Sequence, residues 1–282
     1  VLCAAFGVFG ASSAASAQDE KDWSALARAD LEWAYQQTME SHPGPVDPEN
    51  PGFAEVARQA LDSALAAADQ ATSQGGYAAA VLTFTAAFRD GHFVLFPTGS
   101  ATGTIQWPGF IVTARDRNVI VANTEPGEAD LLGARLISCD GASAEQLMLD
   151  RVFAFVPGKP DQPAYWATEA PRLFVDSENA LAPRLEECRF ALADGSEVAH
   201  QLAWRDTPDD ITERRRAAGF NPEPHTAGIR EVAPGRFWVN LPDFTPDDEE
   251  TERLRALFSE VRERRDELSR AEAIIVDMRG NQ

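Results

Sequence analysis

Several signals that would identify common enzyme classes are missing from this sequence of 282 residues. It has no G-x-S-x-G elbow, no phosphate-binding Walker loop and no dinucleotide fingerprint after a first strand. Cysteine is scarce, with three residues, and no His/Cys cluster has the spacing of a zinc site. We therefore expect no cofactor and no metal site.

Basic residues are also under-represented, because 25 lysines and arginines face 45 aspartates and glutamates. The resulting net charge of -20 and sequence pI near 4.5 disfavour binding to nucleic acid or to anionic membranes. Hydrophobic residues make up 44% of the chain, which is enough for a packed core. The charge by itself is also explained by solubility.

The first 20 residues combine an apolar stretch with small residues and an Ala-Ser-Ala pattern that ends at Ala17. This pattern predicts the latter part of a signal peptide over residues 1–17 and, with it, export to the periplasm or the outside of the cell. The apolar stretch is shorter than the ~20 residues that a bilayer span needs, so we expect no integral span in the mature chain. Of the cysteines that remain, Cys139 and Cys188, export would permit a bridge, but the sequence favours two buried free thiols.

The pattern predicts a mixed α/β protein in several parts. Residues 18–90 show apolar stripes at helical spacing, with a proline-rich break, and predict a small helical bundle. The glycine pair Gly75-Gly76 is expected to end the second helix, and a third helix is expected over residues 77–88. Residues 91–157 contain short β-type runs, "HFVLFP", "GFIVTA", "NVIVANT" and Ala134–Ser138, followed by a helix capped by Ser143, and predict a β-rich module.

Residues 158–282 begin with a proline-rich connection. A hairpin that turns at Asp194-Gly195 comes next, followed by a polar stretch, 206–225, expected to be a surface loop. A strand over Arg236–Leu241 then leads to a helix capped by Thr245, and the apolar run "AIIVDM" predicts a second, buried strand. Strand, amphipathic helix and strand form a βαβ unit with two parallel strands. The carboxyl ends of such strands are where active sites of open α/β sheets lie.

Two short stretches could carry chemistry. In "DMRGNQ", Gly280 allows the backbone to turn sharply after Asp277, so that backbone N–H groups could form an oxyanion hole. In "FRDGHFVLF", His92 lies at the junction between the helical region and the β-rich module and is a candidate general base. An ordinary strand-to-loop turn and a packed turn histidine explain the same residues without function.

The run "AEAIIVDMRGNQ" resembles the strand-and-turn motif of the tail-specific, or C-terminal processing, serine peptidases, with matching positions over Ile274–Asn281. "FRDGHFVLFP" is similar to a family segment in which Asp-Gly-His enters a strand, and "GARLISCDGASAEQL" is similar to part of the family's PDZ-like domain. This resemblance implies a helical N-terminal region over 18–90, a PDZ-like module over 91–157, and the first part of the catalytic domain over 158–282.

The family uses a serine nucleophile with a lysine in some branches and a histidine in tricorn-like branches, and the Asp-Gly-His segment resembles the latter. The resemblance therefore implies an exported serine-type endopeptidase with a peptide or protein substrate, His92 as base and Gly280 at the start of the oxyanion turn. The nucleophile and the glycine run are expected beyond Gln282, so the present sequence alone is expected to be inactive. A non-catalytic binding protein on the same fold, and a hydrolase of another ester or amide, are the alternatives. The sequence carries no signal for an oligomeric state.

Overall fold

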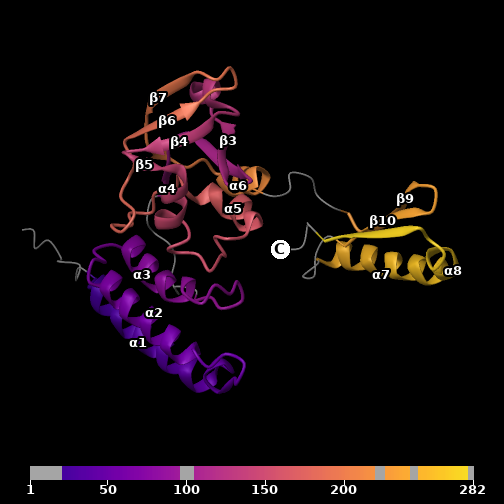
Figure 1. Cartoon of the computed structure of the whole chain (residues 1–282), viewed down its shortest axis with the longest axis horizontal. Coiled ribbons are helices and arrows are strands. Elements are labelled where there is room, and N and C mark those ends of the chain that lie inside the picture. The colour runs from indigo at the N-terminus through magenta and orange to yellow at the C-terminus, as the bar shows by residue number, and fades with distance from the viewer. Residues whose placement is uncertain (1–20, 96–104, 220–225, 242–246, 279–282) are drawn as a thin grey trace, which may run out of the picture.

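The computed structural model describes residues 21–95, 105–219, 226–241 and 247–278. The fold is mixed α/β, with a helical bundle, an antiparallel sheet with its own helices, and a smaller sheet with one long helix (Figure 1). These parts follow one another along the chain in the predicted order. Within the described residues, no helix is both long enough and apolar enough to cross a membrane.

The helical bundle consists of α1 (Trp23–Ser41), α2 (Phe53–Ala68) and α3 (Gln74–Ala86), and it confirms the predicted helices. Asp22 and Ser73 cap α1 and α3, because each side chain accepts a hydrogen bond from the backbone of the first turn. The core is rich in alanine, which lets the helices approach closely around a few large side chains such as Leu31 and Phe84. The pair Gly75-Gly76 was predicted to end the second helix, but it lies in the first turn of α3, because Ser73 caps this helix.

The larger sheet has the strand order β2-β3-β4-β6-β7, and β5 pairs with β4. Its strands confirm the predicted runs at "GFIVTA" and "NVIVANT", the strand near Ala134 and the hairpin at Asp194-Gly195. Ser143 caps α4 as predicted, by accepting a hydrogen bond from the Gln146 N–H. The elements are β2 (Phe110–Arg115), β3 (Asn118–Thr124), β4 (Arg135–Cys139), β5 (Ala142–Ser143), α4 (Ala144–Arg151), β6 (Glu187–Ala191) and β7 (Glu197–Gln201).

This sheet continues past residue 157, where the predicted β-rich module ends, because β6 pairs with β4. The connection between them forms α5 (Pro163–Glu169) and the short 3-10 helix η3 (Ala170–Arg172), which pack against β2. Trp166 and Phe190 from this later segment are fully buried in the same core as Phe110. A local pattern cannot reveal such a pairing between distant strands.

Two segments differ from the sequence-based expectation. The polar stretch 206–225 was predicted to be a loop, but it contains α6 (Ile211–Gly219), which packs against β2 and η3 through one apolar side that includes Ala218. The described part of "HFVLFP", residues 92–95, follows a tight turn and forms no strand. Short strands β1 (Gln106–Trp107) and β8 (Arg205–Asp206) pair with each other beside the sheet.

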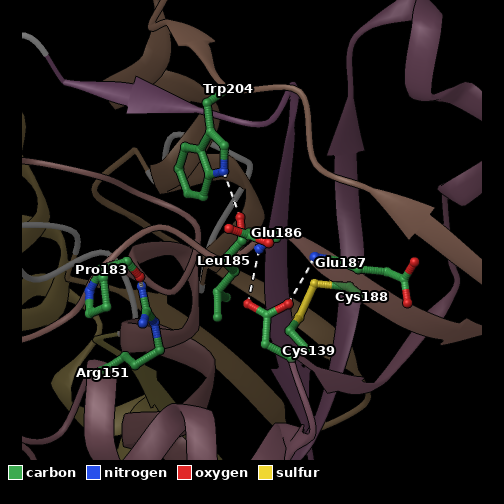
Figure 2. The surroundings of a disulfide bond; sticks show 9 residues. Cys139, Arg151, Pro183, Leu185, Glu186, Glu187, Cys188 and Trp204 are labelled. Carbon is green, nitrogen blue, oxygen red and sulfur yellow. Dashed lines mark hydrogen bonds between the residues drawn. A yellow bond between two sulfur atoms is a disulfide. The ribbon is translucent and has the colours of Figure 1, made fainter.

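The prediction of two free cysteines is wrong, because Cys139 and Cys188 form a disulfide. They are direct partners in the antiparallel pair β4–β6, with Cα atoms 4.0 Å apart. Figure 2 shows the bridge beside Glu186 and Glu187, whose backbone N–H groups donate to the carboxylate of Asp140 at 2.9 Å each. The two cysteines are separated by 49 residues, so only the strand pairing brings them together.

The C-terminal part consists of β9 (Gly228–Ala233), β10 (Arg236–Asn240), α7 (Asp248–Glu263), α8 (Arg265–Leu268) and β11 (Ala273–Asp277). Strands β10 and β11 are parallel, which confirms the predicted βαβ unit. The cap of α7 is Asp247, whose side chain accepts from the Glu250 N–H, and the predicted cap Thr245 lies outside the described residues.

The prediction that β11 is a buried strand is wrong for the described residues. Ile274, Ile275 and Val276 are 44–52% exposed, and only Asp277 at the strand end is buried. The strand lies at the edge of the sheet order β11-β10-β9, so one of its sides has no described neighbour. The apolar side chains of β11 therefore remain largely exposed among the described residues.

Candidate active site

The parallel strands β10 and β11 end at the same edge, where Asn240 and Asp277 are direct partners in the register. The N–H of Leu241 donates to the carbonyl oxygen of Asp277 at 2.8 Å, which holds the two strand ends together. Asp277 is 6% exposed, in contrast to the apolar residues before it. This is the carboxyl edge at which α/β sheets form their sites.

The predicted oxyanion turn begins just after this edge. Met278 is described and 46% exposed, but Gly280 lies outside the described residues. The turn at Gly280 therefore stays a prediction, and the structure contributes the buried strand end from which it starts.

His92 lies on a turn between α3 and the segment that follows. The Asp90 carboxylate accepts a hydrogen bond from the His92 N–H at 2.9 Å, and the Asp90 carbonyl accepts from the Phe93 N–H at 3.1 Å. The imidazole itself is fully exposed, with its Nδ1 3.5 Å from the Asp90 carboxylate. The turn thus fixes the backbone of His92 and leaves its ring accessible.

A neighbouring arginine ties this turn to the sheet module, which comprises residues 105–219 with the larger sheet and its helices. Arg89 has a positive φ of 52°, and its guanidinium donates to the carbonyl oxygens of Phe153 and Gly158 at 3.0 and 3.1 Å. Both carbonyls lie in the segment after α4. His92 is therefore anchored at the junction between the helical bundle and the sheet module.

The structure does not bring the two predicted sites together. No hydrogen bond or ion pair between described residues joins the turn at His92 to the β9–β11 part, and Figure 1 shows that part apart from the bundle. Two other histidines have structural partners: His42 stacks on Phe53 with ring centroids 4.7 Å apart, and His200 Nε2 lies 3.1 Å from the buried carboxylate of Glu128. No cluster suited to a metal ion occurs in the part of the chain that the structure describes.

Sequence reasoning missed a cavity of about 520 Å³ between α3 and the sheet module. Its lining includes three arginines from separate elements, Arg151, Arg172 and Arg215. The sequence contains the triplet Arg214-Arg215-Arg216, but the segment was predicted to be a loop. The prediction therefore did not show that Arg215 lines a cavity.

The fold is related to that of a serine protease. The solved structures that it matches include those of CPAF, a chlamydial serine protease, alone and in complex with lactacystin. Sequence identity is 13–15%, the TM-score is 0.56, and the match covers 93% of this chain but 56–57% of the CPAF chains. The chain thus spans little more than half the length of these structures. Neither the protein-family models nor the curated proteins contain a match.

Proposed function

We propose that this chain is the N-terminal portion of an exported serine-type endopeptidase. The observation that carries the proposal is the parallel pair β10–β11, whose carboxyl edge ends in the buried Asp277 at the motif-bearing run Ile274–Asn281. The protease-like fold supports the same function. A serine that follows Gln282 in the full-length protein would be the nucleophile, and amides at and after Gly280 would stabilise the oxyanion.

Export is part of this proposal. The apolar and small residues of positions 1–17 support it, and so does the disulfide between Cys139 and Cys188, since such bonds persist in oxidising compartments. The His92 imidazole would act as the general base, because it is accessible and its turn is held by two hydrogen bonds to Asp90, one from the His92 N–H and one from the Phe93 N–H.

The sheet module would hold the peptide substrate as an added strand. Within the described residues, β7 is an edge of the sheet and pairs only with β6. The Leu202 N–H donates to the carbonyl oxygen of Glu186, and the Leu192 N–H donates to that of Ser196. In this antiparallel register, the even-numbered residues of β7 therefore direct their backbone N–H and C=O groups toward β6. Alternate residues, among them Ala199, therefore direct their backbone groups outward, where an extended peptide could pair.

Replacing Ala199 with proline is expected to weaken peptide binding and leave folding nearly unchanged. Proline removes the outward N–H of an exposed edge residue, which edge strands tolerate. The matched change, Val198→Pro, removes an inward N–H and should destabilise the sheet instead. Peptide binding by fluorescence anisotropy and thermal unfolding together check this. Unchanged binding in Ala199→Pro would exclude β7 as the peptide-holding edge.

A fluorophosphonate probe applied to the full-length protein tests the proposed function. We expect covalent labelling of one serine C-terminal to Gln282 and loss of peptide hydrolysis on labelling. Labelling of an enzyme that cleaves esters or other amides but no peptide would favour a different hydrolase. Absence of labelling in the folded protein would refute the peptidase and favour a binding protein on the same fold.

A further inference from the structure

A cavity separates α3 from the sheet module and opens to solvent. Its volume of about 520 Å³ lies within the range of small-molecule sites. Much of the lining is apolar and comes from distant parts of the chain, including Leu82, Val94, Phe155 and Tyr165. The cavity could therefore enclose an apolar body of moderate size.

Contacts to backbone carbonyl groups hold the walls of this cavity together. The Ser73 hydroxyl donates to the carbonyl oxygen of Glu178 at 2.7 Å. At Gly75, an added Cβ would lie 1.6 Å from the carbonyl oxygen of Ser177, so α3 approaches the opposite wall as closely as a glycine permits. With the bonds of Arg89 to the segment after α4, these contacts make a cavity that is formed before any ligand arrives.

The cavity is positively charged although the protein is strongly acidic. Arg172 pairs with Glu169 at 2.7 Å, and Arg151 donates to the carbonyl oxygens of Ala182 and Pro183. Arg215 is half-buried and forms no ion pair or hydrogen bond with any residue that the structure describes.

Burial lowers the pKa of Arg215 and the neighbouring positive charge of Arg172 lowers it further, while the carboxylate of Glu169 opposes these effects. Burial also lowers the pKa of Arg151, while the carboxylates of Asp140 and Asp176 oppose that effect. A guanidinium stays charged under all ordinary conditions, so this environment is unfavourable for the protein by itself. An anion in the cavity would remove the penalty.

We propose that this cavity binds a small amphipathic carboxylate, with Arg215 as the principal anion contact and the apolar lining around the rest of the ligand. The fork of the guanidinium matches the two oxygens of a carboxylate. The site differs from the proposed peptidase chemistry in its ligand, a small molecule, although Gly91 and Val94 of its lining flank His92 in the chain. Glu169, which also lines the cavity, favours a singly charged head group over a doubly charged one.

Calorimetric titration of the full-length protein with sodium decanoate tests the proposal. We expect saturable binding of one molecule, and at least about tenfold weaker binding to Arg215→Gln because a charge-assisted contact is lost. The matched control is Arg216→Gln, which removes a charge from the next residue of α6, an exposed side chain that does not line the cavity. This control should bind decanoate as the wild type does, and 1-decanol, which has the same chain without charge, should bind more weakly.

Thermal unfolding without ligand distinguishes a ligand-binding role of Arg215 from a structural role. Arg215→Gln should fold and be at least as stable as the wild type, because it removes a desolvated charge that has no hydrogen bond among the described residues. A purely structural arginine would instead leave a less stable protein. Equal decanoate binding by Arg215→Gln and the wild type would overturn the proposal. So would a lack of saturable binding, equal binding of 1-decanol, or a clear loss of stability in Arg215→Gln without ligand.

Discussion

Replacing Cys139 and Cys188 with alanine together should destabilise the sheet module by about 4 kcal/mol. This figure follows from the loop entropy that a bridge across 49 residues removes from the unfolded chain. Whole domains are stable by only about 5–15 kcal/mol, so the double variant is expected to lose a large part of its margin.

The position of the bridge explains why the effect should centre on this module. Strand β4 belongs to the first half of the sheet and β6 to the second, and α4, α5 and η3 lie between them in the chain. Both cysteines are almost completely buried. The hydrogen bonds from Glu186 and Glu187 to Asp140 tie the same strands together, so the variant should retain the pairing while the fold is intact.

Urea unfolding followed by tryptophan fluorescence measures the change, because Trp166 is fully buried in the core of this module. Dithiothreitol should lower the stability of the wild type toward that of the double variant and leave the double variant unchanged. A free energy of unfolding that differs by less than about 1 kcal/mol between the oxidised wild type and the double variant would contradict the entropic estimate.

The elements that local patterns specify were predictable from the sequence. Ser143 caps its helix with a hydroxyl whose role depends on residues within one turn, and the turn at Asp194-Gly195 joins strands that are neighbours in the chain. The parallel pair β10–β11 was predictable for the same reason, because strand, helix and strand follow one another directly.

Features that depend on distant residues were not predictable. The bridge at Cys139 requires β4 to pair with a strand from beyond the predicted module boundary. Helix α6 looks polar because only a narrow side of it, including Ala218, meets the core. The charged cavity likewise requires Arg151, Arg172 and Arg215 to converge from three separate elements.

Strand β11 shows that burial cannot be predicted from an apolar run alone. Its run of apolar residues indicates a preference for an apolar environment, but burial depends on what lies beside the strand. Among the described residues, β10 covers one side only, and the side chains of Ile274 to Val276 stay about half exposed. The strand and its end at Asp277 were predicted correctly, whereas the surroundings of the strand could not be inferred from its sequence.

His92→Ala in the full-length protein should lower kcat for peptide hydrolysis by roughly 10²–10⁴-fold, the usual contribution of a general base. KM should change little, because the imidazole acts in the transition state and not in substrate binding. The fully exposed side chain has few contacts to lose, so the free energy of unfolding should stay within about 0.5 kcal/mol. Glu32→Ala, an exposed change on α1, is the matched control and should retain wild-type kinetics.

Added imidazole separates proton transfer from a structural role. In His92→Gly, free imidazole should restore part of the lost kcat, because the position is open to solvent and the missing group is the base itself. Full activity in His92→Ala would show that another residue, such as a lysine in the same protein, activates the serine.

The exposure of His92 adds a further expectation about the working enzyme. Proton transfer between base and nucleophile is most effective where water is excluded, and this imidazole is fully exposed among the described residues. If His92 is the base, another part of the full-length protein must cover it when substrate binds. Diethylpyrocarbonate should therefore modify His92 readily in the free protein and slowly once a serine-directed inhibitor occupies the site. Equal modification rates in both states would place His92 outside the active site.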